Sequence, residues 1–100
     1  MNIKKRIEQI IKNETFEGFS SIQDRFLNGD CESLAILLLE ADSNGEIIKI
    51  RQNNNGSIFN HYIYKRNELF YDINGEFYSI KELMAKIDYF DVKKEYSIIN

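Results

Sequence analysis

The 100-residue sequence contains one cysteine, one histidine, no tryptophan and no proline. A lone cysteine excludes an internal disulfide, and without a second cysteine or a cluster of histidines it cannot assemble a zinc site. Cys31 is therefore either a reactive thiol or a small packing residue. The lack of proline, together with abundant Ile, Asn and Lys, indicates an AT-rich coding sequence and favours a bacterial or phage origin.

Long apolar runs and an excess of positive charge are also missing. The longest apolar run, Leu34 to Leu39, is far shorter than the about 20 residues that cross a bilayer, so we expect no membrane partner. Polar residues interrupt the isoleucines that follow Met1, which argues against a secretory signal and predicts a cytoplasmic location. The formal net charge of -3 disfavours nucleic-acid partners, because phosphate binding needs clustered Lys and Arg.

What remains is an ordinary globular composition, 43% hydrophobic and 29% charged, which predicts a single domain over residues 1–100. Isoleucines at helical spacing predict an amphipathic helix over residues 2–13, whereas residues 14–29 have no regular period and are expected to form a packed loop with room for a helical turn. Asp30 is a typical N-cap, and the apolar run after it predicts a buried helix over residues 31–41 that carries Cys31 in its first turn.

After residue 45 the apolar period changes to two, which predicts an antiparallel β-meander. Ser79 and Glu82 have the spacing of a capping box that opens a helix through residue 87, and a short strand is expected at residues 96–99. The predicted strands of the meander are 46–52, 57–66, 68–73 and 76–78. The fold class is therefore α+β, with an N-terminal helix, a central buried helix carrying Cys31, an antiparallel meander and a C-terminal helix.

The hairpin between the second and third predicted strands brings two functional side chains together. If Arg66-Asn67 is its two-residue loop, His61 falls directly opposite Asp72, and side chains in such pairs have Cβ atoms about 4.5–5.5 Å apart. An imidazole and a carboxylate at that separation can hydrogen-bond. The hairpin alone therefore predicts a His–Asp pair.

The preceding turn, Asn55-Gly56, places Ile50 opposite His61 in the same way, and Ile48 opposite Ile63. The sheet face that carries these residues needs an apolar cover. The helix that begins at Cys31 is the most apolar candidate, so we expect it to lie on this face and to bring its thiol toward His61.

These three residues have the chemistry of a thiol nucleophile. A helix N-terminus and an adjacent imidazolium both favour the reactive thiolate of Cys31. His61 would pair with the thiolate and protonate the leaving group, and Asp72 would hold His61 in the productive tautomer. Backbone N–H groups at the start of the helix would stabilise an oxyanion, with the side chains of Asn28 or Gln23 as further donors.

The same residues resemble a known superfamily over about residues 28–83. The run Asp30-Cys31-Glu32-Ser33-Leu34-Ala35 is similar to the Asp-Cys-Ser-Gly-Leu opening of NlpC-type papain-like cysteine peptidases. The stretch from His61 to Tyr64 resembles the histidine strand of those enzymes and of transglutaminase-like proteins. Phe70 to Phe77 resembles a Tyr-Asp-x-x-Gly-Glu stretch of small bacterial and phage proteins of this kind. The resemblance implies a minimal papain-like fold that cleaves or transfers at an amide, thioester or isopeptide bond without metal or cofactor.

Each residue also has an ordinary explanation. Free cysteines are commonly buried filler, His61 is compatible with a satisfied histidine in a strand, and Asp72 is compatible with a residue leading into the Asn74-Gly75 turn. The order of the three residues and their predicted register favour the triad over three unrelated roles. The resulting hypothesis is a cytosolic thiol hydrolase or acyl transferase acting on a peptide or glutamine-type amide of an intracellular target.

A second hypothesis is a non-enzymatic binding protein on the same scaffold, such as an inhibitor, an immunity protein or an anti-defence factor. Two sets of residues are candidates for a protein-binding surface. The aromatic set is more typical of the two faces of a sheet, and the acidic set more typical of a solvated surface. The aromatic set is Phe59, Tyr62, Tyr64, Tyr71, Phe77 and Tyr78, and the acidic set is Glu14, Glu17, Asp24, Asp30 and Glu32.

Overall fold

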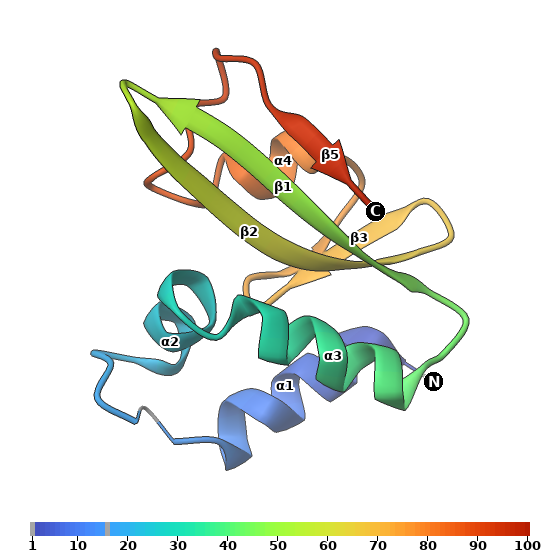
Figure 1. Ribbon diagram of the computed structural model, residues 1–100. Coiled ribbons are helices and arrows are strands. Elements are labelled where there is room, and N and C mark those ends of the chain that lie inside the picture. The colour runs from blue at the N-terminus through green and yellow to red at the C-terminus, as the bar shows by residue number, and fades with distance from the viewer. Residues whose placement is uncertain (1, 16) are drawn as a thin grey trace.

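A computed structural model of the chain describes residues 2–15 and 17–100 and shows a five-stranded antiparallel sheet with helices on both faces (Figure 1). The helices are α1 (Ile3–Asn13), α2 (Ile22–Asn28), α3 (Cys31–Ala41) and α4 (Ile80–Met84). The strands are β1 (Glu46–Asn54), β2 (Ser57–Arg66), β3 (Leu69–Asp72), β4 (Gly75–Phe77) and β5 (Ser97–Ile99), in the sheet order β4-β3-β2-β1-β5. The predicted α+β class, with its N-terminal helix, Cys31 helix, meander and C-terminal helix, is confirmed.

One element differs from the expectation, because residues 14–29 include the helix α2 rather than only a packed loop. The Ser21 hydroxyl caps α2 by accepting the N–H of Asp24 at 3.0 Å. Ile22 and Phe26, one helical turn apart, bury their side chains in the core. This short amphipathic helix stabilises the approach to α3.

The first helical layer covers one face of the sheet with α1, α2 and α3. α1 contributes its isoleucine stripe and α3 contributes Leu34, Ala35 and Leu38, and these side chains pack against Tyr64 and Tyr71 of the sheet. Alternation along the strands sends these two tyrosines to the α3 side and their neighbours to the other side. None of the helices formed by the described residues is long and apolar enough to span a membrane.

The opposite face carries Ile48, Ile50 and Ile63, and its cover corrects a prediction. This face packs against α4 and the segment after it, through Leu83, Met84, Ile87 and Phe90, and not against α3 as we expected. The reason is that α4 begins three residues after β4 ends, and its Leu83 and Met84 supply the apolar cover for this face. The helix α3 lies on the other side of the sheet.

Two polar side chains of β1 fasten this C-terminal segment to the sheet. The Gln52 amide donates to the Asp91 carbonyl and accepts from the Asp91 N–H, both at 2.7 Å. Asn54 donates to the carbonyl of Tyr89 at 2.9 Å. Gln52 is buried, so its amide needs these partners. Residues 89–91 are thereby held in a fixed position beside β1.

Candidate active site

The structure brings His61 and Asp72 together as predicted, although through a different register. His61 Nε2 lies 3.0 Å from Asp72 Oδ2, and both side chains are almost completely buried. The strands β2 and β3 pair as Arg66 with Leu69 and Tyr64 with Tyr71, so the loop is residues 67–68 and not 66–67. Continuing this register puts Asp72 opposite Ile63, which makes it a diagonal neighbour of His61 on the same face.

A shift of two residues explains why the pair survives the wrong register. Side chains alternate with a period of two, so a slip of one residue would have turned Asp72 away, whereas a slip of two keeps it on the same face. The Asp72 carboxylate also accepts the N–H of Asn74 at 2.8 Å, which fixes its orientation. The β1–β2 register, with Ile50 opposite His61 and Ile48 opposite Ile63, is as predicted.

Cys31 reaches this pair at an edge of the sheet and not through a covered face. In the described residues, β3 pairs with β2 only over residues 64–66, so the earlier part of β2 has β1 on one side and the α2–α3 connection near the other. Leu27, just before Cys31, packs against both hydrophobic cores, and the Tyr89 hydroxyl donates to its carbonyl at 2.6 Å. The two layers therefore meet beside β2, at the start of α3.

The electrostatics of Cys31 favour its thiolate. Burial alone would raise the pKa of the thiol, but a hydrogen bond from His61, a backbone hydrogen bond from Tyr62 and the charge of His61 outweigh it. A backbone hydrogen bond from Glu32 acts in the same direction, and the net effect is a lowered pKa. A thiolate is the form that attacks a carbonyl carbon.

The electrostatics of His61 favour its cation. Burial would lower the pKa of the imidazole, but the hydrogen bonds and charges of Asp72 and Cys31 raise it to about 9. Asp72 occupies Nε2, which leaves Nδ1 for the thiol. Nδ1 is buried and has no partner of regular hydrogen-bond geometry among the described residues. The imidazole is thus held by a carboxylate at Nε2, and Cys31 lies near enough to contribute to its raised pKa.

A pocket of about 410 Å³ opens over Cys31. Cys31 lines this pocket, whereas His61 and Asp72 do not. One wall comes from β2, the other from the α2–α3 connection, and Tyr89 closes the side, where its ring stacks on Phe59 at 5.2 Å between centroids. The lining residues are Leu27, Asn28, Gly29, Cys31, Ile58, Phe59, Asn60, Tyr62 and Tyr89.

The two predicted oxyanion donors are placed differently. Asn28 lines the pocket, but its Nδ2 donates to Asp24 Oδ1 at 2.7 Å. Gln23 is exposed on α2 and is not among the residues that line the pocket. The structure therefore brings Asn28 but not Gln23 to the pocket of Cys31, and leaves the Asn28 oxygen without a hydrogen bond among the described residues. Asn60 is the amide that offers its nitrogen, and the sequence analysis did not single it out.

Arg25 fixes the approach to Cys31. Asp30 holds the N-cap position of α3 without a capping hydrogen bond, and its carboxylate instead accepts from Arg25 Nε at 2.8 Å. Arg25 also donates to the carbonyl of Thr15 at 2.8 Å and lies 3.5 Å from Glu14 and from Glu17. Three acidic residues of the predicted acidic surface thus surround one arginine.

The predicted aromatic surface is divided between the two faces of the sheet. Tyr64 and Tyr71 are buried in one core and Phe77 in the other, so the six aromatic residues do not form one exposed patch. Tyr78 is the most exposed of them, at 76%. Most of this set therefore contributes to packing.

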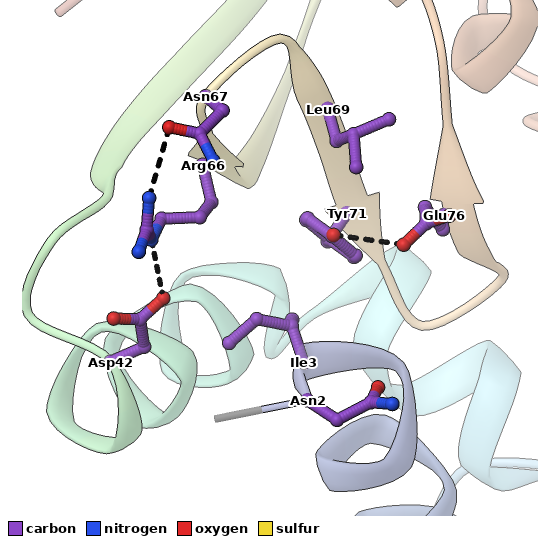
Figure 2. A pocket seen from close by; sticks show the side chains of 8 residues that line it. All are labelled: Asn2, Ile3, Asp42, Arg66, Asn67, Leu69, Tyr71 and Glu76. Atoms are coloured by element: carbon purple, nitrogen blue, oxygen red, sulfur yellow. Dashed lines mark hydrogen bonds and ion pairs between the residues drawn. The ribbon is translucent and has the colours of Figure 1, made fainter.

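A second pocket, of about 400 Å³, lies away from the triad between the start of α1 and the β2–β3 hairpin (Figure 2). Its charged groups are already paired: Arg66 with Asp42 at 2.8 Å, and the Tyr71 hydroxyl with Glu76 at 2.9 Å. These pairs join β2 to the end of α3 and β3 to β4. We interpret the residues of this pocket as structural, because their side-chain pairs hold these elements together.

Comparison with known proteins overturns the papain-like assignment. Residues 4–99 match the model of the family described as Phage YunG-like protein, which is not a papain-like peptidase family. The similarity of the Cys31, His61 and Asp72 segments to NlpC-type and transglutaminase-like proteins is thus a local likeness and does not show membership of their superfamily. No curated protein and no solved structure gives a significant match to the chain.

Proposed function

We propose that this chain, which belongs to the Phage YunG-like protein family, is a thiol-dependent hydrolase or acyl transferase that acts on an amide bond of a protein or peptide. Cys31 is the nucleophile, His61 the proton donor and acceptor, and Asp72 the orienting carboxylate. The proposal rests on one observation: His61 is buried, with Asp72 bonded at Nε2 and Nδ1 unpaired among the described residues, and the Cys31 thiol lies near enough to contribute to its raised pKa. A cysteine that only filled space in the core would gain nothing from a neighbouring His61 cation.

The arrangement supports a sequence of steps in which these three residues carry the bond and proton changes. The thiolate attacks the amide carbon, and the negative charge passes to the amide oxygen. His61 then gives its Nδ1 proton to the leaving nitrogen, the C–N bond breaks, and a thioester remains on Cys31. Water or an amine then attacks the thioester carbon, gives a proton to His61 and frees the thiolate. Asp72 keeps the imidazole oriented and stabilises its cation throughout.

Thiol reactivity tests the proposal directly. At pH 6 a thiol of ordinary pKa, about 8.5, is well under about 1% thiolate, so it reacts slowly with iodoacetamide. We expect Cys31 to react at least about tenfold faster than this at pH 6 and to lose that advantage in His61→Gln. Asp72→Asn should lose part of it, whereas Asp88→Asn, the same change at an exposed position, should keep it.

Intact mass after treatment with an electrophilic acyl probe provides the second measurement, with Cys31→Ser as the blank. Thermal unfolding of each variant shows whether it is folded before its reactivity is compared. A native thiol that stays inert until the chain is denatured would refute the enzyme and favour the non-enzymatic binding protein.

A further inference from the structure

Two asparagines line the pocket of Cys31 from different walls. Asn28 is the last residue of α2, and Asn60 lies on β2 directly before His61. Each amide is held at one end by a neighbour. Asn28 Nδ2 donates to Asp24 Oδ1 at 2.7 Å, and Arg51 Nε donates to Asn60 Oδ1 at 3.1 Å. These bonds fix which end of each amide remains for a ligand.

The free ends are complementary. Among the described residues, no hydrogen bond is made by Asn28 Oδ1 or by Asn60 Nδ2, so two exposed residues of the pocket lining keep one acceptor and one donor for a ligand. The rest of the lining is largely apolar and aromatic, with Leu27, Phe59 and Tyr89. No aspartate, glutamate, lysine or arginine lines the pocket in the described part of the chain. Such a site suits a group that is neutral, has an apolar stem, and both donates and accepts.

We propose that the substrate group is a primary carboxamide, such as the side chain of glutamine in a protein or peptide, and that the chain releases ammonia from it. This inference rests on the proposed thiol chemistry. Asn60 Nδ2 donates to the carboxamide oxygen, Asn28 Oδ1 accepts from its NH₂ group, and the aromatic walls surround the methylene stem. A carboxylate is disfavoured because it would place an oxygen against the Asn28 oxygen. An ammonium is disfavoured because no aspartate or glutamate lines the pocket in the described part of the chain.

The reaction balances with water as the only co-reactant. The Cys31 sulfur bonds to the carboxamide carbon, the C–N bond breaks, and the Nδ1 proton of His61 leaves with the nitrogen as ammonia. Water then attacks the thioester carbon, the C–S bond breaks, and His61 takes one proton from the water. The products are a carboxylate and ammonium, and the thiolate and imidazolium are restored.

Ammonia release tests the inference, with a blocked Gln-Gly dipeptide as the probe and a blocked Ala-Gly dipeptide as the control. We expect ammonia and conversion of glutamine to glutamate with the first, and neither ammonia nor peptide-bond cleavage with the second. Cys31→Ser should abolish the release.

One isosteric change removes the donor. Asn60→Asp keeps the size of the side chain and the oxygen that accepts from Arg51, but replaces the NH₂ group with an oxygen and adds a negative charge. We expect kcat/KM for the Gln-Gly dipeptide to fall at least about tenfold. Asn53→Asp is the matched control, because Asn53 is exposed outside this pocket and its oxygen accepts from the N–H of Gly56 at 3.0 Å. It adds the same charge and should leave the rate unchanged.

The outcomes separate the two proposals. A His61-dependent thiolate that cleaves peptide bonds and releases no ammonia from the Gln-Gly dipeptide overturns the carboxamide and leaves the thiol enzyme standing. An equal loss of rate in Asn60→Asp and Asn53→Asp also overturns the assigned contacts. A thiol that is inert in the native protein overturns both proposals together.

Discussion

His61 and Asp72 meet diagonally across the β2–β3 hairpin, with Nε2 and Oδ2 3.0 Å apart and both side chains enclosed by the core. If the β2–β3 register is continued by one residue, the position directly opposite Asp72 belongs to Ile63, an apolar side chain. Both members of the pair are buried from water, so its effect on the pKa of His61 is correspondingly strong. Several measurements depend on this shielding.

The first prediction concerns Asp72→Asn. The new amide oxygen can still accept from the N–H of Asn74, but its NH₂ group would face Nε2, which must then act as an acceptor. Because burial then acts with less opposition, we expect the pKa of His61 to fall from about 9 to below its ordinary value of 6.5. The NMR titration of the imidazole measures this. An unchanged midpoint would show that Asp72 does not support the cation.

The second prediction concerns stability against pH. The folded-state pKa of His61 lies above its unfolded value, so its charge stabilises the fold fully below about pH 6.5 and this contribution is lost as pH rises through about 9. The shift is worth at most about 3 kcal/mol. The lowered pKa of Cys31 changes stability with pH in the opposite direction, so the measurement uses Cys31→Ser. Without the thiolate the pKa of His61 is raised less, and its stabilising charge is therefore lost at a lower pH.

Chemical denaturation of Cys31→Ser between pH 6 and pH 10 should therefore show falling stability. The same series in Cys31→Ser/His61→Gln should be flatter over this range. Parallel curves for the two proteins would contradict the assignment of the charge to His61.

The third prediction concerns Gly45, where the backbone passes close to β2. A Cβ at this position would overlap the ring and hydroxyl of Tyr64 and the carbonyl of Lys65. Tyr64 is fully buried and its hydroxyl donates to the Asp42 carbonyl, so it has little freedom to move aside. We expect Gly45→Ala to lower the free energy of unfolding by about 1–3 kcal/mol. Ser43→Ala, an exposed position in the same connection, should change it by less than about 0.5 kcal/mol.

The fourth prediction concerns Arg25→Lys. Lysine keeps the charge but cannot reach the Thr15 carbonyl and the Asp30 carboxylate with a planar fork. We expect a loss of about 1–3 kcal/mol in stability and slower alkylation of Cys31, because Asp30 precedes it directly. Arg6→Lys, on α1, is the matched control. Equal reactivity of the two variants would show that Arg25 does not position the thiol.

Much of the fold could be predicted because its turns and periods are strong. Asn55-Gly56 forms a tight turn with both residues at positive φ, which fixed the β1–β2 register correctly. The next hairpin has no glycine. Asn67 has a positive φ and is the first residue of the loop, whereas we predicted it as the second. Arg66 stays in β2, where it pairs with Asp42. No local sequence pattern indicates this ion pair, so the predicted loop begins one residue too early.

The sequence singled out Cys31, His61 and Asp72, but it did not predict how the fold assembles them, and it included Gln23, which lies outside the pocket. Alternation along β2 and β3 placed His61 and Asp72 on one face whichever of the two registers held. The cover of that face was wrong, because the choice rested on the hydrophobicity of α3 and neglected Leu83, Met84 and Phe90. Tyr89 and Asn60 were missed because their roles depend on where β3 stops pairing with β2, which is a tertiary feature.

Gln52 anchors the segment that carries Tyr89, a residue of the pocket wall, although Gln52 itself does not line the pocket. Its side-chain amide hydrogen-bonds to both the N–H and the carbonyl of Asp91, as the backbone of a neighbouring strand would. Unlike a strand, it does not require buried and exposed side chains to alternate along residues 89–91. The segment carrying Tyr89 can therefore change in sequence without losing its anchor. Conversely, replacing Gln52 with a residue of another length would shift Tyr89 and change the shape of the pocket, while Cys31, His61 and Asp72 would stay unchanged.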